Sequence, residues 1–212
     1  MDTELILFAR SPVAGQAKTR MIPDLGEQGA ANLAVALLEE SVQRSVEAWP
    51  GTVSLRVWPD TGHECLNRIR RRYGITVAGQ ADGDLGAKMF AALNAAYERG
   101  VAAAVMGCDA PHCPAETLRA AHTFLARGRS VIGPSTDGGY YLIGINPPDP
   151  GCFERINWGG ARVFDTTLKR AARAGIHLIV LQQLNDIDTM ADLEALRESH
   201  PELVDRLLES KT

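Results

Sequence analysis

The apolar run at residues 101–106 constrains the fold more than any other stretch, because all six of its residues are apolar. A strand with one solvent-exposed face alternates apolar and polar residues, and this run neither alternates nor is long enough for a helix. It therefore predicts a strand buried on both faces, as at the centre of a parallel sheet. A helical pattern begins at about Pro114, with Glu116 in its first turn.

Asp109 stands between this strand and that helix, just before Ala110 and Pro111. It is therefore expected past the carboxyl end of a central strand, where open α/β sheets bind ligands. A carboxylate in that place could hold a divalent metal against a phosphate, since magnesium usually takes one or two oxygen ligands from protein. It could equally cap the helix or close a turn, and this stretch alone favours neither interpretation.

Strand and helix patterns alternate along the rest of the chain, as in α/β proteins. Apolar or alternating runs predict strands at 4–9, 52–58, 75–78, 130–133 and 177–181, and an aromatic strand after Gly139. Helical spacing predicts helices at about 29–48, 64–73, 87–99, 114–127 and 161–174, one capped by Thr189 and Asp192, and a last one at 201–209. No repeat or composition shift marks a boundary, so residues 1–212 are expected to form one domain.

The bulk properties exclude several classes of protein. Apolar residues make up 45% of the 212, which is enough for a sizeable core, and the net charge of −4 indicates neither nucleic acid nor an anionic membrane as partner. No apolar run approaches the roughly 20 residues of a membrane span, and no basic segment opens the chain as in a signal peptide. The four cysteines lack disulfide spacing or a complete zinc set, so a reducing cytoplasm is expected.

The loop at residues 10–20 follows the first predicted strand and combines small residues with three cations and no acid. Backbone N–H groups around Gly15 could converge on a phosphate together with Arg10, Lys18 and Arg20. The loop lacks the spacing of a Walker motif. The alternative is a solvated basic loop, but the position directly after the strand favours phosphate binding.

Three further segments carry polar side chains at expected strand ends. Gln80 offers a donor and an acceptor to a nucleobase edge, although turn chemistry with a helix N-cap also explains the loop 80–86. Asp137 could accept from hydroxyl groups, although its Asp-Gly pair is also a hairpin signal. Asp186 and Asp188 alternate as in an extended segment and so point to one side, where either could supply a second metal ligand.

Taken together, four motifs resemble the radical-SAM/selenodomain-associated transferases, also called arsenosugar-biosynthesis glycosyltransferases. The motifs are FARSPVAGQAKTR with MIPDLG behind it, QADGDLGAKM, MGCDAPHCP with IGPSTDGGYYLIG behind it, and LNDIDTMADL. The resemblance covers nearly the whole chain, and its Lys-Thr-Arg and Asp-Gly-Gly-Tyr-Tyr elements are the most specific. Three positions depart from the family pattern, where lysine, a small hydroxyl residue and arginine are commoner: Arg10, Cys108 and Lys88.

This family belongs to the nucleotide-diphospho-sugar transferase (GT-A) superfamily, so the resemblance implies a three-layer α/β/α sandwich with a mostly parallel mixed sheet. It also implies Mg²⁺ or Mn²⁺ on Asp109 and Asp188. The implied nucleotide site consists of Arg10, Gly15, Lys18, Arg20, Gln80, Asp84 and Gly86. The implied acceptor site consists of Gly138, Gly139, Tyr140 and Tyr141.

The leading hypothesis is a glycosyltransferase that uses a nucleotide-diphosphate sugar and a small-molecule acceptor, with Asp109, Lys18 and Asp137 as catalytic residues. Asp137 is the candidate base. The alternative is a nucleotidyltransferase that uses an NTP and releases pyrophosphate, because a cationic cradle suits a triphosphate. An inactive nucleotide-binding scaffold, or a fold in which every aspartate only caps or turns, is less favoured. The base, the sugar, the acceptor and the oligomeric state, including a homodimer, stay open.

Overall fold

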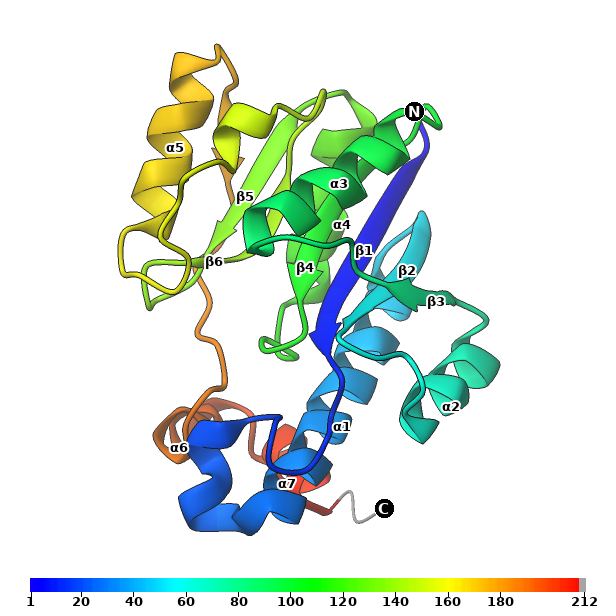
Figure 1. Cartoon of the computed structure of the whole chain (residues 1–212), viewed down its shortest axis with the longest axis vertical. Helices are drawn as coiled ribbons and strands as arrows, with labels where there is room; N and C mark the ends of the chain where they lie inside the picture. Colours follow the sequence, from blue (N-terminus) through cyan, green and yellow to red (C-terminus); the bar gives the residue numbers. More distant parts are fainter. Residues whose placement is uncertain (210–212) are drawn as a thin grey trace.

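The computed structural model describes residues 1–209 and has one seven-stranded sheet with the order β3-β2-β1-β4-β6-β5-β7 (Figure 1). β6 runs antiparallel to both of its neighbours, and the other neighbouring strands pair in parallel. The strands are β1 (Thr3–Arg10), β2 (Thr52–Trp58), β3 (Thr76–Gly79), β4 (Ala102–Gly107), β5 (Ser130–Pro134), β6 (Tyr140–Gly144) and β7 (Leu178–Val180).

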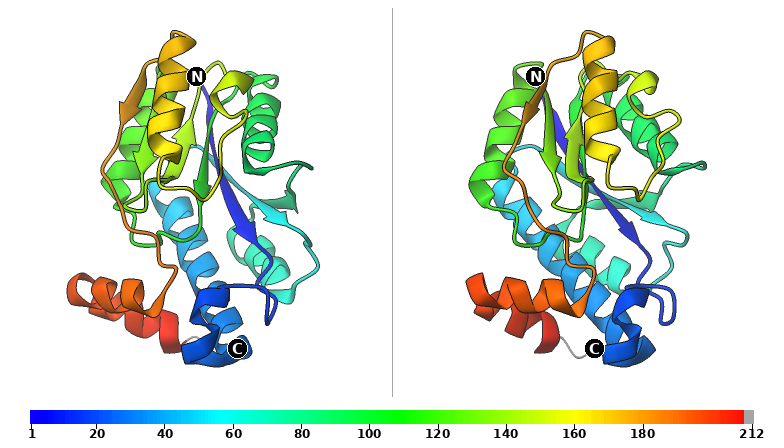
Figure 2. Two further views of the ribbon diagram at one scale, coloured as in Figure 1. Left: turned by 60° about the vertical axis from the view of Figure 1, so that its left-hand side comes forward. Right: turned by 90° about the vertical axis from the view of Figure 1, so that its left-hand side faces the viewer.

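Helices cover both faces of the sheet, which confirms the predicted three-layer sandwich (Figure 2). One core cluster joins the sheet to α1 (Ile22–Ala48), α2 (Glu64–Tyr73) and α4 (Ala115–Ala126). A second cluster joins the opposite face to α3 (Leu85–Tyr97) and α5 (Val163–Arg173). The remaining elements are η1 (Thr19–Met21), η2 (Pro150–Cys152), α6 (Met190–Ser199) and α7 (Pro201–Glu209).

β4 confirms the prediction of a strand that is buried on both faces. Ala104 and Met106 belong to one core cluster, whereas Ala103 and Val105 belong to the other. Both sets of side chains meet helices, so no position on this strand is free for a polar residue. The strand pairs in parallel with β1 but antiparallel with β6, so it lies at the boundary between the parallel and the mixed part of the sheet.

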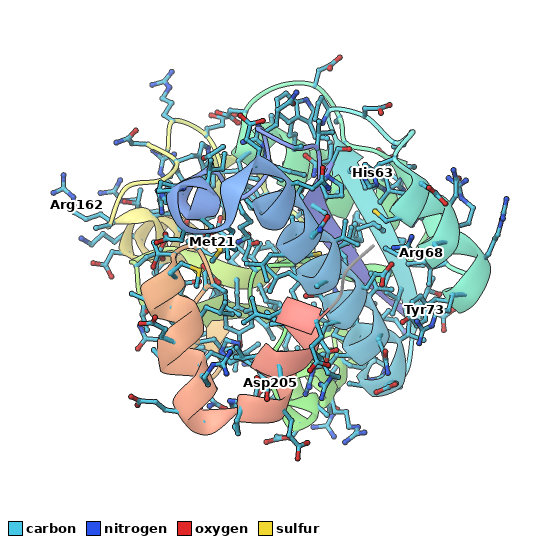
Figure 3. The ribbon with its side chains drawn as sticks, turned by 90° about the horizontal axis from the view of Figure 1, so that it is seen from below. Met21, His63, Arg68, Tyr73, Arg162 and Asp205 are labelled. Atoms are coloured by element: carbon cyan, nitrogen blue, oxygen red, sulfur yellow. The ribbon has the colours of Figure 1, made fainter. Side chains whose placement is uncertain are left out.

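The first helix begins seven residues before its expected start at residue 29, because α1 starts at Ile22. Pro23 suits a first turn, where its missing N–H has no intrahelical partner. Gly26 then interrupts the helix with φ 70°, so the helical periodicity is regular only beyond it. The other end of the chain covers this segment: α6 and α7 pack along α1 in a third apolar cluster that includes Met21 (Figure 3).

The carboxyl ends of β1, β2 and β4 meet at one edge of the sheet, which faces α6 and the start of α1 (Figure 1). The segment before α6 crosses this edge and is fixed there by backbone hydrogen bonds, among them two to the segments after β4 and β5. Ile187 N donates to Asp109 O at 2.8 Å, and Thr136 N donates to Leu184 O at 3.0 Å. The expected capping box of Thr189 and Asp192 then starts α6. Within residues 1–209, no helix is long and apolar enough to cross a membrane.

Candidate active site

A pocket of about 600 Å³ opens at this edge of the sheet, within the size range of small-molecule sites. Its walls come from the segment after β1, the end of β2, the start of α3, and the segments after β4, β5 and β7. Most of the predicted site residues line it: Arg10, Lys18, Arg20, Gln80, Asp109, Asp137, Gly139, Tyr140, Tyr141 and Asp188, together with Asp186.

Four of the predicted site residues do not line the pocket but shape its walls. Asp84 caps α3, its Oδ1 accepting from Ala87 N at 2.8 Å. Gly86 lies so close to the Phe153 carbonyl and the Trp158 ring that a Cβ atom would be 2.6 Å from each. Gly15 and Gly138 occupy turns with φ 74° and φ 89°, which suit glycine.

Lys18 is the centre of the end of the pocket that we call the carboxylate end, made of Lys18, Asp109, Ile187 and Asp188. Its Nζ lies 2.6 Å from Asp109 Oδ1 and 3.0 Å from Asp188 Oδ1. Nζ also donates to Ile187 O at 2.6 Å. Three oxygen atoms from two distant segments therefore surround one ammonium group.

The surroundings of Lys18 keep it charged, and its backbone has an uncommon conformation. Burial lowers the pKa of the ammonium, but the Asp109 and Asp188 carboxylates outweigh this effect, so the pKa lies above its ordinary value. Only 10% of the side chain is exposed. The backbone is left-handed, with φ 46° and ψ 46°, which is strained for a residue with a Cβ atom.

Two more charged groups flank this centre. Arg20 NH1 lies 3.5 Å from Asp188 Oδ2, the oxygen that Lys18 does not contact. Burial, together with the charges of Asp109, Asp137 and Asp188, raises the pKa of Asp186 to about 6, although the nearby Ser135 hydroxyl acts in the opposite direction. Asp188, rather than Asp186, shares the cation with Asp109.

The oxygen atoms around Lys18 Nζ fit a divalent metal of the Mg²⁺ or Mn²⁺ kind. They are two carboxylate oxygens and one carbonyl oxygen, and hard cations of this kind bind through oxygen, with water and substrate phosphate as further ligands. Residues 1–209 contain no cluster of three or more His, Cys, Asp or Glu side chains that could hold a metal. A metal here would therefore depend on ligands from the substrate or from water.

Trp58 is the centre of the opposite end, which we call the aromatic end, made of Arg10, Trp58, Gln80 and Lys88. Lys88 Nζ lies 4.3 Å from the centroid of the Trp58 ring, and the Arg10 guanidinium lies 5.3 Å from it. Both are cation–π distances. Gln80 Nε2 donates to Ala9 O and Arg56 O, each at 3.2 Å, so its amide oxygen is the part left for a ligand.

A third wall of the pocket, from the segments around β6, is aromatic and carries Asp137. Asp137 Oδ1 accepts from Gly139 N at 2.8 Å, so the expected hairpin turn between β5 and β6 is present and Oδ2 is not used in it. Tyr140 meets Trp158 edge to face at 6.3 Å between ring centroids. Tyr141 is buried, and its hydroxyl donates to Gln182 O at 3.0 Å.

Sequence reasoning missed Trp58, because the alternating pattern of its strand placed it among ordinary strand residues. A usable signal was present: it is a tryptophan at the last position of a strand that is followed by a loop. In the structure Trp58 pairs in register with Arg10, and 40% of it is exposed, which is high for so large an apolar residue.

Comparisons with solved structures agree with this fold. A presumed nucleotide-diphospho-sugar transferase from Desulfovibrio desulfuricans G20 is similar with a TM-score of 0.81 and 27% identity, over 98% of this chain and 99% of that chain. A cytidylyltransferase from Leptospira borgpetersenii has a TM-score of 0.58 and 13% identity, over 100% and 98%. A manganese complex of Rv0371c from Mycobacterium tuberculosis H37Rv has a TM-score of 0.54 and 17% identity, over 94% and 100%.

The two less similar structures support the fold alone, and the first also supports membership of the nucleotide-diphospho-sugar transferase superfamily and a transferase activity. No curated protein matches the sequence. A family profile described as "Uncharacterized protein conserved in bacteria (DUF2064)" matches residues 41–160, which is more than half of the sequence. The chain therefore belongs to the DUF2064 family.

Proposed function

We propose that this protein is a metal-dependent glycosyltransferase that transfers a sugar from a nucleotide-diphosphate sugar to a small-molecule acceptor. The observation that carries the proposal is the convergence of Asp109 Oδ1, Asp188 Oδ1 and Ile187 O on one cation at the edge of the pocket. Oxygen ligands at the carboxyl ends of the strands suit a metal that holds a donor diphosphate. The superfamily supports the same chemistry.

Each part of the pocket has a role in this proposal. Lys18 and Arg20 hold the donor phosphates, and the aromatic end holds the nucleoside, with Gln80 Oε1 as an acceptor for a base. A metal held by Asp109 and Asp188 would neutralise the negative charge that develops on the departing diphosphate. Positioning and electrostatic stabilisation by the side chains account for most of the rate enhancement.

Asp137 is the candidate base. The acceptor hydroxyl oxygen attacks the anomeric carbon, the bond from that carbon to the diphosphate oxygen breaks, and the nucleoside diphosphate leaves with the bonding electrons. The acceptor proton passes to the free carboxylate oxygen, Oδ2, of Asp137.

A nucleotidyltransferase is the second candidate, and the number of basic side chains in the pocket favours it. Four basic side chains line the pocket, which is more than a diphosphate requires and suits a triphosphate whose outer phosphates leave: Arg10, Lys18, Arg20 and Lys88. The fold is shared with a cytidylyltransferase. In this reaction, an acceptor oxygen would attack the α-phosphorus and pyrophosphate would leave.

A ligand screen followed by product analysis separates the two candidates. Thermal unfolding is measured with common NTPs and sugar nucleotides, each with and without Mg²⁺ or Mn²⁺, for the wild type and Asp109→Ala. A ligand at about 100 times its Kd stabilises by about 2.7 kcal/mol, which is easily measured. Glycosyl transfer requires a metal-dependent shift with a sugar nucleotide and release of nucleoside diphosphate. Pyrophosphate formed from an NTP would instead establish the second candidate.

A further inference from the structure

The position of Lys18 raises a question about the order in which ligands bind. The atoms that would hold a metal already hold the lysine ammonium, at 2.6 Å from Asp109 Oδ1 and 3.0 Å from Asp188 Oδ1. A divalent metal bonded to the same oxygen atoms at about 2.0–2.1 Å would lie beside the Lys18 ammonium. Only 10% of the Lys18 side chain is exposed, so solvent screens the repulsion between the two positive charges poorly. The ammonium and the metal therefore compete for one position.

We propose that Lys18 occupies the metal position when no nucleotide is bound, and that donor phosphate draws the ammonium away so that metal and nucleotide bind together. This inference rests on the proposed function, because it takes the donor to be a phosphate ester. In the nucleotide-free protein the carboxylates are already neutralised, so metal alone binds weakly. A phosphate offers Lys18 new oxygen acceptors and at the same time supplies ligands to the metal.

The backbone supports a lysine that moves. Lys18 is one of two non-glycine residues with positive φ within residues 1–209, and a left-handed conformation persists only where surrounding contacts enforce it. The three oxygen contacts of Nζ join this residue to Asp109 and to the segment 187–188, and they are the contacts that a donor phosphate would replace. A lysine stem is long and flexible enough to carry its ammonium to a neighbouring phosphate.

Arg20 provides a matched control, because it contacts the same carboxylate without occupying the shared position. Its NH1 lies 3.5 Å from Asp188 Oδ2, on the side of the carboxylate away from Lys18, and 72% of its side chain is exposed. Replacing Arg20 removes one positive charge from the same site without vacating the metal position. A solvent-screened charge of this kind has a small effect.

The test is calorimetric titration of MnCl₂ into the nucleotide-free full-length wild type, Lys18→Met, Arg20→Met and the double variant Lys18→Met/Asp109→Asn. We expect Lys18→Met to bind Mn²⁺ at least tenfold more tightly than the wild type, Arg20→Met to stay within threefold, and the double variant to lose the gain. Equal or weaker binding by Lys18→Met overturns the inference. Tight binding of Mn²⁺ by the wild type in the absence of nucleotide also overturns the inference, but leaves the proposed function intact.

Failure of the proposed function has a different signature. If neither the wild type nor Lys18→Met binds Mn²⁺, alone or with any NTP or sugar nucleotide, both the inference and the metal-dependent function are wrong. If Lys18→Met binds Mn²⁺ tightly but no nucleotide stabilises any variant, competition for the metal position holds and the proposed donor is wrong.

Chemical labelling of the wild type gives a second readout that does not depend on the folding of a variant. Lysine acetylation is quantified by peptide mass spectrometry with and without MnCl₂ at a concentration that saturates the titration. We expect labelling of Lys18 to rise several-fold with metal, because its ammonium is displaced toward solvent, while the exposed Lys169 is unchanged. Unchanged Lys18 labelling at saturation would show that the metal does not displace it, and would overturn the inference.

Discussion

The two ends of the pocket carry the same kind of charge but hold it in different ways. At the carboxylate end, Lys18 is almost fully buried against two carboxylates and a carbonyl. At the aromatic end, Arg10 and Lys88 lie over the Trp58 ring, and neither has an ion-pair partner within residues 1–209. An aromatic ring orients a cation without neutralising it.

This difference determines what each end can do with a phosphate. The cations at the aromatic end keep their full charge, so an anion can bind there by simple addition. The cation at the carboxylate end is already paired, so a ligand can bind only by exchange of partners. We therefore expect substitutions at the carboxylate end to act on catalysis and metal binding, and substitutions at the aromatic end to act on donor affinity.

Asp109→Asn should have the largest effect. The substitution removes one charge from the metal position while preserving the shape of the side chain, so we expect turnover of the donor found in the screen to fall at least about 10²-fold. Stability should change by only about 1 kcal/mol, because the Asp109 side chain is half exposed and Lys18 keeps Asp188 and Ile187 O as partners. Steady-state kinetics with a thermal unfolding control measures both. Retention of more than a tenth of the activity would assign Asp109 to the turn alone.

Acidification should next weaken the loop that carries Asp109. Burial, and to a smaller extent the charges of His200 and Arg44, lower the pKa of His112, in this loop, to about 4. Because this value lies below the ordinary 6.5, the unfolded chain binds the proton more readily. The contribution of His112 to the free energy of unfolding is present above about pH 6.5 and is lost as the pH falls toward 4. We expect the wild type to lose roughly 1–2 kcal/mol between pH 7 and pH 5 from this group.

Denaturant unfolding at pH 7, 6 and 5 measures this loss. His112→Gln should flatten the dependence, whereas His177→Gln, at an exposed position, should retain it. An unchanged pH dependence in His112→Gln would mean that other groups cause the acid sensitivity.

The contrast between the ends also shows which parts of the site the sequence can predict. The position of Asp109 follows from local rules, because a fully apolar run must be a buried strand and its carboxyl end must face the ligand edge. The convergence of Lys18, Asp109 and Asp188 does not follow from such rules. Lys18 and Asp188 are 170 residues apart, and they meet because Ile187 N is bonded to Asp109 O.

Residues at the aromatic end were harder to predict, because their contacts depend on how α3 and the Trp158 ring are placed in the fold. The position of Trp58 at the end of a strand is visible in the sequence, but its contact with Lys88 depends on how α3 is placed. The resemblance predicts Gly86 at the base, and in the structure this glycine lets the Trp158 ring approach the start of α3. A glycine allows close approach by a nucleobase or by a tryptophan ring, so the sequence alone does not tell which of the two lies beside Gly86.

Trp58→Leu should weaken donor binding about tenfold and leave metal affinity unchanged. The substitution removes two cation–π contacts of about 0.5–1 kcal/mol each, so that Arg10 and Lys88 lose their fixed positions. Trp58→Phe, which keeps a ring, should retain most of the affinity. Titration of the donor and of MnCl₂ against each variant provides the measurement. An unchanged donor affinity in Trp58→Leu would mean that the aromatic end does not contribute to donor binding.

Two helix caps allow the smallest and most closely matched comparison. Thr189 caps α6 next to the metal position, and Asp84 caps α3 at the aromatic end. Thr189→Ala and Asp84→Ala should each cost about 1 kcal/mol of stability in denaturant unfolding, because each exposes one backbone N–H at a helix start. Thr189→Ala should also weaken metal binding two- to threefold, since Asp188 precedes the cap directly. Asp84→Ala should leave metal binding unchanged, and a larger loss of donor affinity than of stability would give its carboxylate a direct role in binding the base. If both variants weaken metal binding equally, the two ends of the pocket respond as one rigid unit. The distinction between binding by exchange of partners at the carboxylate end and binding by addition at the aromatic end is then wrong.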